Sequence, residues 1–82
     1  MENWPDDALS RLAESWDILL KIGRADGIAF VGQLYGLVLA GTDRTKAVSV
    51  LRTSLETFQR LGMTAQAEEV TDLLKAVEPQ AG

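Results

Sequence analysis

The side chains that could take part in chemistry are carboxylates, basic side chains and one phenol, Tyr35. The chain has 82 residues and contains neither cysteine nor histidine, so thiol nucleophiles, imidazole bases, disulfides and the usual zinc ligands are excluded. The closest carboxylates are Asp6 beside Asp7 and Glu68 beside Glu69. Such pairs are more often surface charge than acid–base machinery unless their environment perturbs them. We therefore expect no enzyme: no catalytic residue, no metal site and no cofactor.

Charge and composition narrow the class of protein further. The net charge is −4, and the eight Lys and Arg residues are scattered along the chain. Nucleic-acid binding needs a basic surface, so we expect no nucleic-acid partner. No run approaches the roughly 18 to 20 apolar residues of a membrane span, and the chain begins with acidic rather than basic residues. We expect one domain over residues 1–82, with no membrane partner and a cytoplasmic location.

These side chains must be held by helices, because apolar residues recur at helical spacing and no stretch alternates with period two. The first expected helix begins around Trp4 and Pro5 and ends near Gly23, and the second covers residues 27–40. The third starts at a Thr42 or Asp43 cap and stops at Gly62, and the fourth, capped by Thr64, ends before Pro79. Trp16 is expected in the core. The predicted fold is all-α, with four antiparallel helices arranged as two helical hairpins.

The two hairpins resemble each other. A shift of 39 positions lays Leu12 on Leu51, Gly23 on Gly62 and Leu34 on Leu73. The predicted repeats cover approximately residues 5–41 and 43–78, between a short acidic N-terminus and a flexible C-terminal tail at 79–82. An alternative explanation is that any two amphipathic hairpins of equal length align in this way. The coincident glycines at the joints favour a true repeat.

The stretch "AGTDRTKAVSVLRTSLETFQRLGMTAQAEEVTDLL" resembles the tetratricopeptide-like (TPR-like) helical repeats of bacterial regulators. These repeats combine a small-residue turn, Ala-x3-Leu, an aromatic or Leu, Leu-Gly and an Ala-rich helix. The resemblance covers most of residues 6–77. It implies that the helices follow the order second, first, second, first, so that helices two and three form the one whole repeat. It also implies TPR-like αα packing and protein binding as the usual role.

The second expected helix has no charged face. In the fourth helix the outward positions include Glu68, Glu69 and Asp72, but the same positions of the second helix carry no charge. Small residues repeat at every fourth position, which allows another helix to approach closely. The candidate interaction residues are Ala29, Phe30, Gly32, Gln33, Gly36, Leu37 and Ala40. Either the fourth or first helix of the same chain covers this strip, or a second copy or a foreign helix does.

The first helix offers a weaker candidate. Arg11, Ile18 and Ile22 form a mixed ridge beside its main apolar face. This ridge could be a minor contact surface, but an ordinary wide core stripe is the favoured interpretation.

The leading functional hypothesis is a non-enzymatic TPR-like interaction module. It would self-associate, with a homodimer expected, and bind a protein or peptide through the second helix, with Phe30 and Tyr35 as aromatic anchors. Two alternatives stay open. One is a small acidic inhibitor or antitoxin-like regulator that occludes a partner's active or nucleic-acid-binding site. The other is a self-assembly element whose copies stack through the incomplete ends of the repeat.

Overall fold

A computed structural model describes residues 6–78, with the side chains from residue 8 onward. This part of the chain contains four α-helices and no β-strand. Their bounds are α1 Asp6–Ile22, α2 Ala25–Leu39, α3 Arg44–Arg60 and α4 Thr64–Val77. The all-α prediction is therefore confirmed.

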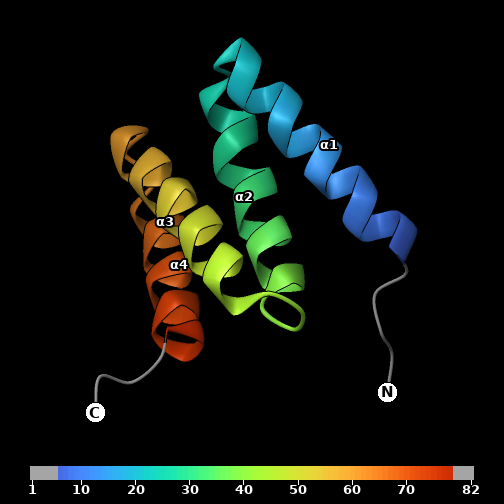
Figure 1. Ribbon diagram of the computed structural model, residues 1–82. Helices are drawn as coiled ribbons and strands as arrows, with labels where there is room; N and C mark the ends of the chain where they lie inside the picture. Colours follow the sequence, from blue (N-terminus) through green and yellow to red (C-terminus); the bar gives the residue numbers. More distant parts are fainter. Residues whose placement is uncertain (1–5, 79–82) are drawn as a thin grey trace.

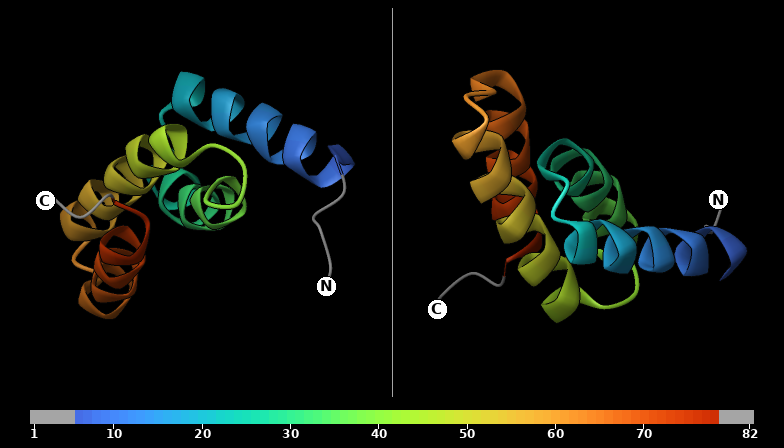
Figure 2. Two further views of the ribbon diagram at one scale, coloured as in Figure 1. Left: turned by 60° about the horizontal axis from the view of Figure 1, so that its bottom comes forward. Right: turned by 90° about the horizontal axis from the view of Figure 1, so that it is seen from above.

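Successive helices run in opposite directions and lie side by side in chain order (Figure 1). The packing follows the same order, α1 against α2, α2 against α3 and α3 against α4, with α2·α3 the largest of the three interfaces. In the two views of Figure 2, α1 lies on one side of α2 while α3 and α4 lie on the other. As a result α2 has a neighbour on each of two sides, whereas α1 and α4 stand at the ends of the stack.

The ends of the helices agree with part of the prediction. Asp43 caps α3, because its carboxylate accepts a hydrogen bond of 3.1 Å from the backbone N–H of Lys46. The prediction that Thr64 caps α4 is wrong, since Thr64 is the first helical residue and the capping position belongs to Met63, whose side chain makes no capping bond. The predicted start around Trp4 and Pro5 and the tail at 79–82 lie outside the described residues.

The second helix begins at Ala25 rather than at the predicted residue 27. Arg24 is extended, and Asp26 lies in the first turn. The Asp26 carboxylate accepts hydrogen bonds from the backbone N–H of Gly27 at 2.8 Å and from Nε of Arg24 at 3.3 Å. These bonds stabilise the start of a helix whose glycines have low intrinsic helix propensity.

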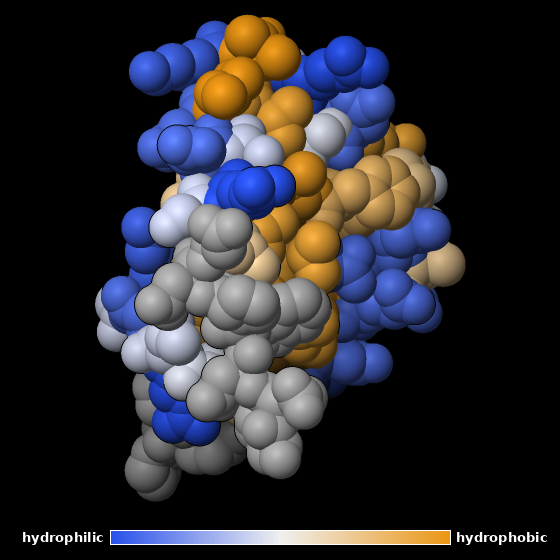
Figure 3. All heavy atoms as spheres, turned by 90° about the vertical axis from the view of Figure 1, so that its right-hand side faces the viewer, coloured by the Kyte–Doolittle hydropathy of each residue, from blue (hydrophilic) through white to orange (hydrophobic). Residues whose placement is uncertain are grey.

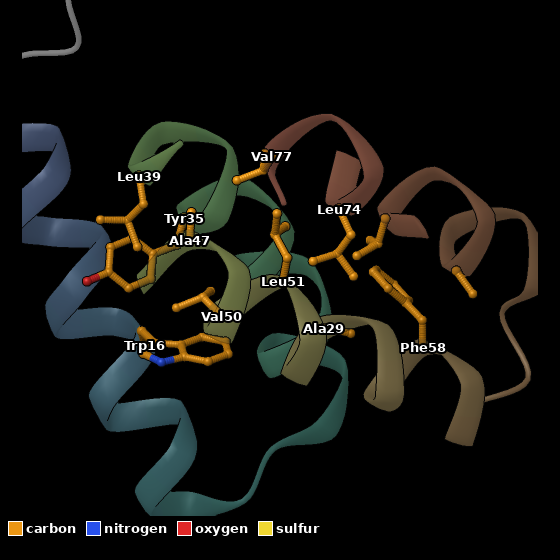
Figure 4. Packing of buried hydrophobic residues seen from close by; sticks show 12 residues of the cluster. Trp16, Ala29, Tyr35, Leu39, Ala47, Val50, Leu51, Phe58, Leu74 and Val77 are labelled. Carbon is orange, nitrogen blue, oxygen red and sulfur yellow. The ribbon is translucent and has the colours of Figure 1, made fainter. Parts of the chain in front are cut away.

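A single buried cluster joins all four helices. Trp16 of α1 is 7% exposed, which confirms its predicted place in the core. Figure 4 shows Trp16 reaching from α1 toward Tyr35, and their ring centroids lie 6.2 Å apart. The other buried members of the cluster are Ala29, Leu39, Ala47, Val50, Leu51, Phe58, Ala67, Val70, Leu74 and Val77.

The two hairpin joints have the same geometry at a separation of 39 residues. Gly23 has φ +69° and Gly62 has φ +74°, a left-handed conformation that glycine adopts without steric cost. The N–H of Arg24 bonds the carbonyl of Leu19, and the N–H of Met63 bonds that of Phe58. The first turn of the following helix begins in the same way in both joints: the N–H of Ile28 donates to the carbonyl of Arg24, and the N–H of Ala67 donates to that of Met63. The predicted glycine joints are therefore found, with equivalent backbones.

Candidate protein-interaction surface

Glycines let α2 approach both of its neighbours closely. A Cβ atom on Gly36 would lie 2.5 Å from the Leu51 side chain of α3. At Gly32 a Cβ atom would lie 2.7 Å from the Trp16 ring of α1 and 3.0 Å from Cβ of Ser54. Any residue larger than glycine would thus force the helices apart at both positions.

One buried hydrogen bond joins α3 to the backbone of α2. The Ser54 hydroxyl donates to the backbone carbonyl of Ala29 at 2.6 Å, and both residues are fully buried. Ser54 is small enough to fit against Gly32, so its hydroxyl reaches the α2 backbone. The buried polar group is thereby satisfied at the centre of the interface.

The structure separates the seven candidate residues of the second helix into three groups. Ala29, Gly32 and Gly36 are buried inside the chain. Phe30 and Leu37 are each 47% exposed. The remaining two, Gln33 and Ala40, are half-buried. The small residues of the strip therefore face the protein's own helices, and its large apolar residues face outward.

The covering helices agree in part with the expectation of the fourth or the first helix. The first helix, α1, contributes Trp16 at Gly32 as expected, but α3 rather than the fourth helix lies over Gly36 and Ala29. The two neighbours account for the small and apolar residues on two sides of α2, because they remove these sides from water. They do not account for the apolar residues on its exposed side. Whether a partner contacts the outward residues stays a prediction.

The outward face of α2 is an apolar surface formed by Phe30, Leu34 and Leu37, which we call the α2 ridge. Their exposed fractions are 47%, 44% and 47%. Their spacing of four and then three residues places them on one side of the helix, where close to half of each side chain is exposed. Viewed from the side where α1 lies, the molecule shows a band of hydrophobic surface with hydrophilic residues on each side (Figure 3).

The base of the ridge is fixed by contacts with α3 and α4. The Phe30 ring meets the Phe58 ring edge-on, with centroids 5.0 Å apart and planes at 90°. Beside the ridge, Nε2 of Gln33 donates a hydrogen bond of 3.3 Å to a carboxylate oxygen of Glu69 on α4. The exposed Asp26 lies one helical turn before Phe30. Acidic groups therefore border the ridge at one end and along the α4 side.

Two residues of α2 differ from expectation. Leu34 belongs to the exposed ridge, although the 39-residue shift paired it with Leu73, which is half-buried in α4. Tyr35, proposed as an anchor, is 2% exposed between Trp16 and Lys46, whose Nζ lies 5.9 Å from the Tyr35 ring centroid. Phe30 is therefore the one aromatic side chain of α2 that a partner could reach without rearrangement.

The candidate ridge on α1 also faces outward. Ile18 is 57% exposed and Ile22 is 63% exposed. Arg11 is exposed as well. The favoured interpretation as a wide core stripe is therefore wrong for these side chains.

Within the described residues, no group of three or more His, Cys, Asp or Glu side chains could hold a metal ion. A hollow of about 260 Å³ at the α3–α4 joint is lined by Gln59, Gly62, Thr64, Ala67, Glu68 and Thr71. Glu68 is its one ionisable lining residue, so this hollow offers no acid–base pair. None of the described helices is long and apolar enough to cross a membrane.

No protein family model, curated protein or solved structure matches the chain. The structure thus establishes a small four-helix, all-α fold. The TPR-like pairing and the functional role are taken up as proposals below.

Proposed function

We propose that this protein is a non-enzymatic, TPR-like interaction module that binds a protein or peptide through the α2 ridge and also self-associates. The observation that carries the proposal is the ridge itself. Close to half of each side chain of the ridge is exposed to solvent, on a helix that packs against neighbours on its other sides. Contiguous apolar surface of this kind is characteristic of protein contact sites.

The ridge suits a partner that presents an apolar face. Burying the exposed half of each large side chain contributes about 1 kcal/mol before the costs of association. Phe30 is the strongest anchor, because its contact with Phe58 already restricts the ring and little side-chain entropy is lost on binding. A groove-binding helix with apolar side chains at i, i+3 or i+4, and i+7 has matching geometry.

The border of the ridge favours a partner with basic flanks. Asp26 and Glu69 lie beside the apolar residues, and the chain carries a net charge of −4. Opposite charge on the partner would speed its encounter more than it would add to affinity. A protein of this class would act in the cytoplasm, without cofactor, nucleic acid or membrane.

The TPR-like part of the proposal assigns α2 and α3 to one repeat, with α1 and α4 as halves of its neighbours. Three features support it: the equivalent joints at Gly23 and Gly62, the stacking of helices in chain order, and the close α2–α3 packing. In such an array α2 and α4 are helices of the same type. The hydrogen bond between Gln33 and Glu69 connects them along one face.

Site-specific photo-crosslinking in cells tests the proposal. A photoreactive phenylalanine analogue replaces Leu37 on the ridge, and the matched control carries it at Ser49, an exposed position of α3. We expect a discrete heavier adduct from position 37 that disappears when Leu34→Asp is added. Identical adduct patterns from positions 37 and 49 would reject the ridge as a binding site. Steep loss of the adduct with salt would instead favour the inhibitor-like alternative.

A further inference from the structure

A comparison of equivalent residues in the two hairpins shows which helix faces are covered by a neighbouring helix and which are not. Because residue 15 corresponds to residue 54 and residue 18 to residue 57, each position on α1 can be compared with its counterpart on α3. On α3 the residues Val50, Ser54 and Thr57 are all buried, and Ser54 bonds the backbone of α2.

The counterparts on α1 are exposed. Arg11, Ser15 and Ile18 stand at the positions of those three residues, and Ile22 continues the same line. In the described chain no helix lies on this side of α1, because the stack begins there. Ile18 and Ile22 have the largest exposed fractions, 57% and 63%, of the large apolar side chains described. At the α1 end of the stack this side of the helix therefore exposes Ile18 and Ile22 between polar residues, and none of the described helices covers it.

The α4 end is different. The residues of α2 that contact α3 are Ala29, Gly32 and Gly36, and their counterparts on α4 are Glu68, Thr71 and Lys75. Glu68 and Lys75 are exposed. A copy stacked head to tail would set Glu68 and Lys75 against Ile18 and Ile22 of α1, a desolvation cost that the single charge of Arg11 on this line does not offset for both. Open-ended stacking is thus disfavoured, and the apolar end needs a partner with a similar apolar face.

We infer that the exposed seam of α1, formed by Arg11, Ser15, Ile18 and Ile22, is a homodimer contact that pairs with the same seam of a second copy in antiparallel orientation. The spacing of four, three and four residues is that of a coiled-coil seam. Two-fold antiparallel pairing places Ile18 against the second copy's Ser15, in both directions. Ile22 then lies opposite Arg11 of the second copy at each outer end of the seam, where the Arg11 methylenes can contact Ile22 while the guanidinium stays in water. Such a contact closes on itself, as most homodimers do.

The charges beside the seam fit this orientation. Glu14 and Lys21 flank the seam on the same side, seven residues apart, and neither forms an ion pair within the described residues. Antiparallel pairing brings Glu14 of each copy near Lys21 of the other, so two attractive pairs form at once. In-register parallel pairing would instead bring Glu14 near Leu19 of the second copy, so neither attractive pair would form. The charge pattern therefore selects one orientation.

This inference deepens the self-association in the proposed function and leaves the α2 ridge available for a different partner. The seam is short, so the dimer is expected to be weak and to form in the micromolar range or above. Its experiment therefore uses variants on α1, and its control uses a variant on the α2 ridge, so that the two surfaces are judged separately.

Sedimentation equilibrium of the full chain, from about 10 µM to about 1 mM, measures the dimerisation constant. Ile18→Asp should weaken it by at least about a hundredfold, because two carboxylates would be buried at the centre. Glu14→Lys should weaken it about tenfold by opposing two lysines, and the double variant Glu14→Lys, Lys21→Glu should recover most of the loss. Circular dichroism checks that each variant stays folded.

Leu37→Asp on the α2 ridge is the matched control and should leave the dimerisation constant unchanged. If Leu37→Asp dissociates the dimer while Ile18→Asp does not, the copies meet through the α2 ridge and the inference is overturned. A wild-type monomer over the whole range also overturns it. Neither result affects crosslinking of a partner at position 37, so failure of the inference is distinct from failure of the proposed function.

Discussion

The hydroxyl of Ser54 on α3 donates a 2.6 Å hydrogen bond to the backbone carbonyl of Ala29 on α2. Ala29 and Ser54 are both fully buried, and Gly32 lies against the Ser54 side chain. The small residue Ser54 of α3 therefore packs directly against small residues of α2. This contact covers, within the same chain, the small residues of α2 for which the sequence also allowed a second protein as the covering partner.

Ser54→Ala should lower the free energy of unfolding by about 1 kcal/mol, since it removes a buried hydrogen bond but adds no volume. Urea denaturation followed by circular dichroism measures the change. The control is Ser49→Ala, at an exposed position on the same helix, which should shift stability by less than about 0.5 kcal/mol. Equal effects at the two positions would show that the hydrogen bond across the interface contributes nothing.

Gly23→Ala and Gly62→Ala should each destabilise the protein by about 1 to 2 kcal/mol, because both positions have positive φ. Nothing lies within 4 Å of a Cβ atom at either glycine, so the cost is conformational and not steric. Equivalent joints predict nearly equal losses in thermal or urea unfolding. A large loss at one glycine with none at the other would contradict the structural equivalence of the two hairpins.

The carboxyl of Asp26 should titrate below its usual pKa of 3.8, chiefly because the backbone N–H of Gly27 donates to the charged form, with Arg24 a smaller cause. NMR titration measures this pKa directly. Since the pKa is lower in the folded state, the stabilisation is present above the unfolded value and disappears as the pH falls through the folded one. In Arg24→Gln most of the lowering should remain. A normal pKa in that variant would assign the effect to Arg24 instead.

Much of the fold was predictable because the information is local. Helical periodicity gave four helices, glycines marked both hairpin joints, and Asp43 stands where a cap is needed. The start of α2 was missed by two residues, because Ala25 and Asp26 carry no apolar periodicity. The absence of a side-chain cap at Met63 likewise left Thr64 as the apparent capping residue.

The surface was predicted less well because periodicity defines a face of a helix but not its neighbour. Gly32 and Gly36 indicated that another helix packs closely against α2. The small residue Ser54 in the middle of α3 was the sequence signal that could have identified α3 as that helix. The 39-residue shift paired Leu34 with Leu73, but Leu73 is half-buried in α4 and Leu34 is exposed. That comparison fails because α4 has one neighbour in the stack, whereas α2 has two and its exposed arc is displaced.

The central structural claim is that the small residues of α2 are internal packing and that the ridge alone faces outward. The most direct measurement is the free energy of unfolding of Gly36→Leu in urea, beside Gly41→Ala, where a Cβ atom meets only the Val38 carbonyl at 3.8 Å. Gly36→Leu should lose at least about 2 kcal/mol by displacing Leu51, and Gly41→Ala should stay within about 0.5 kcal/mol of the wild type. If Gly36→Leu retains the wild-type free energy of unfolding, α3 does not cover this face and the account is contradicted.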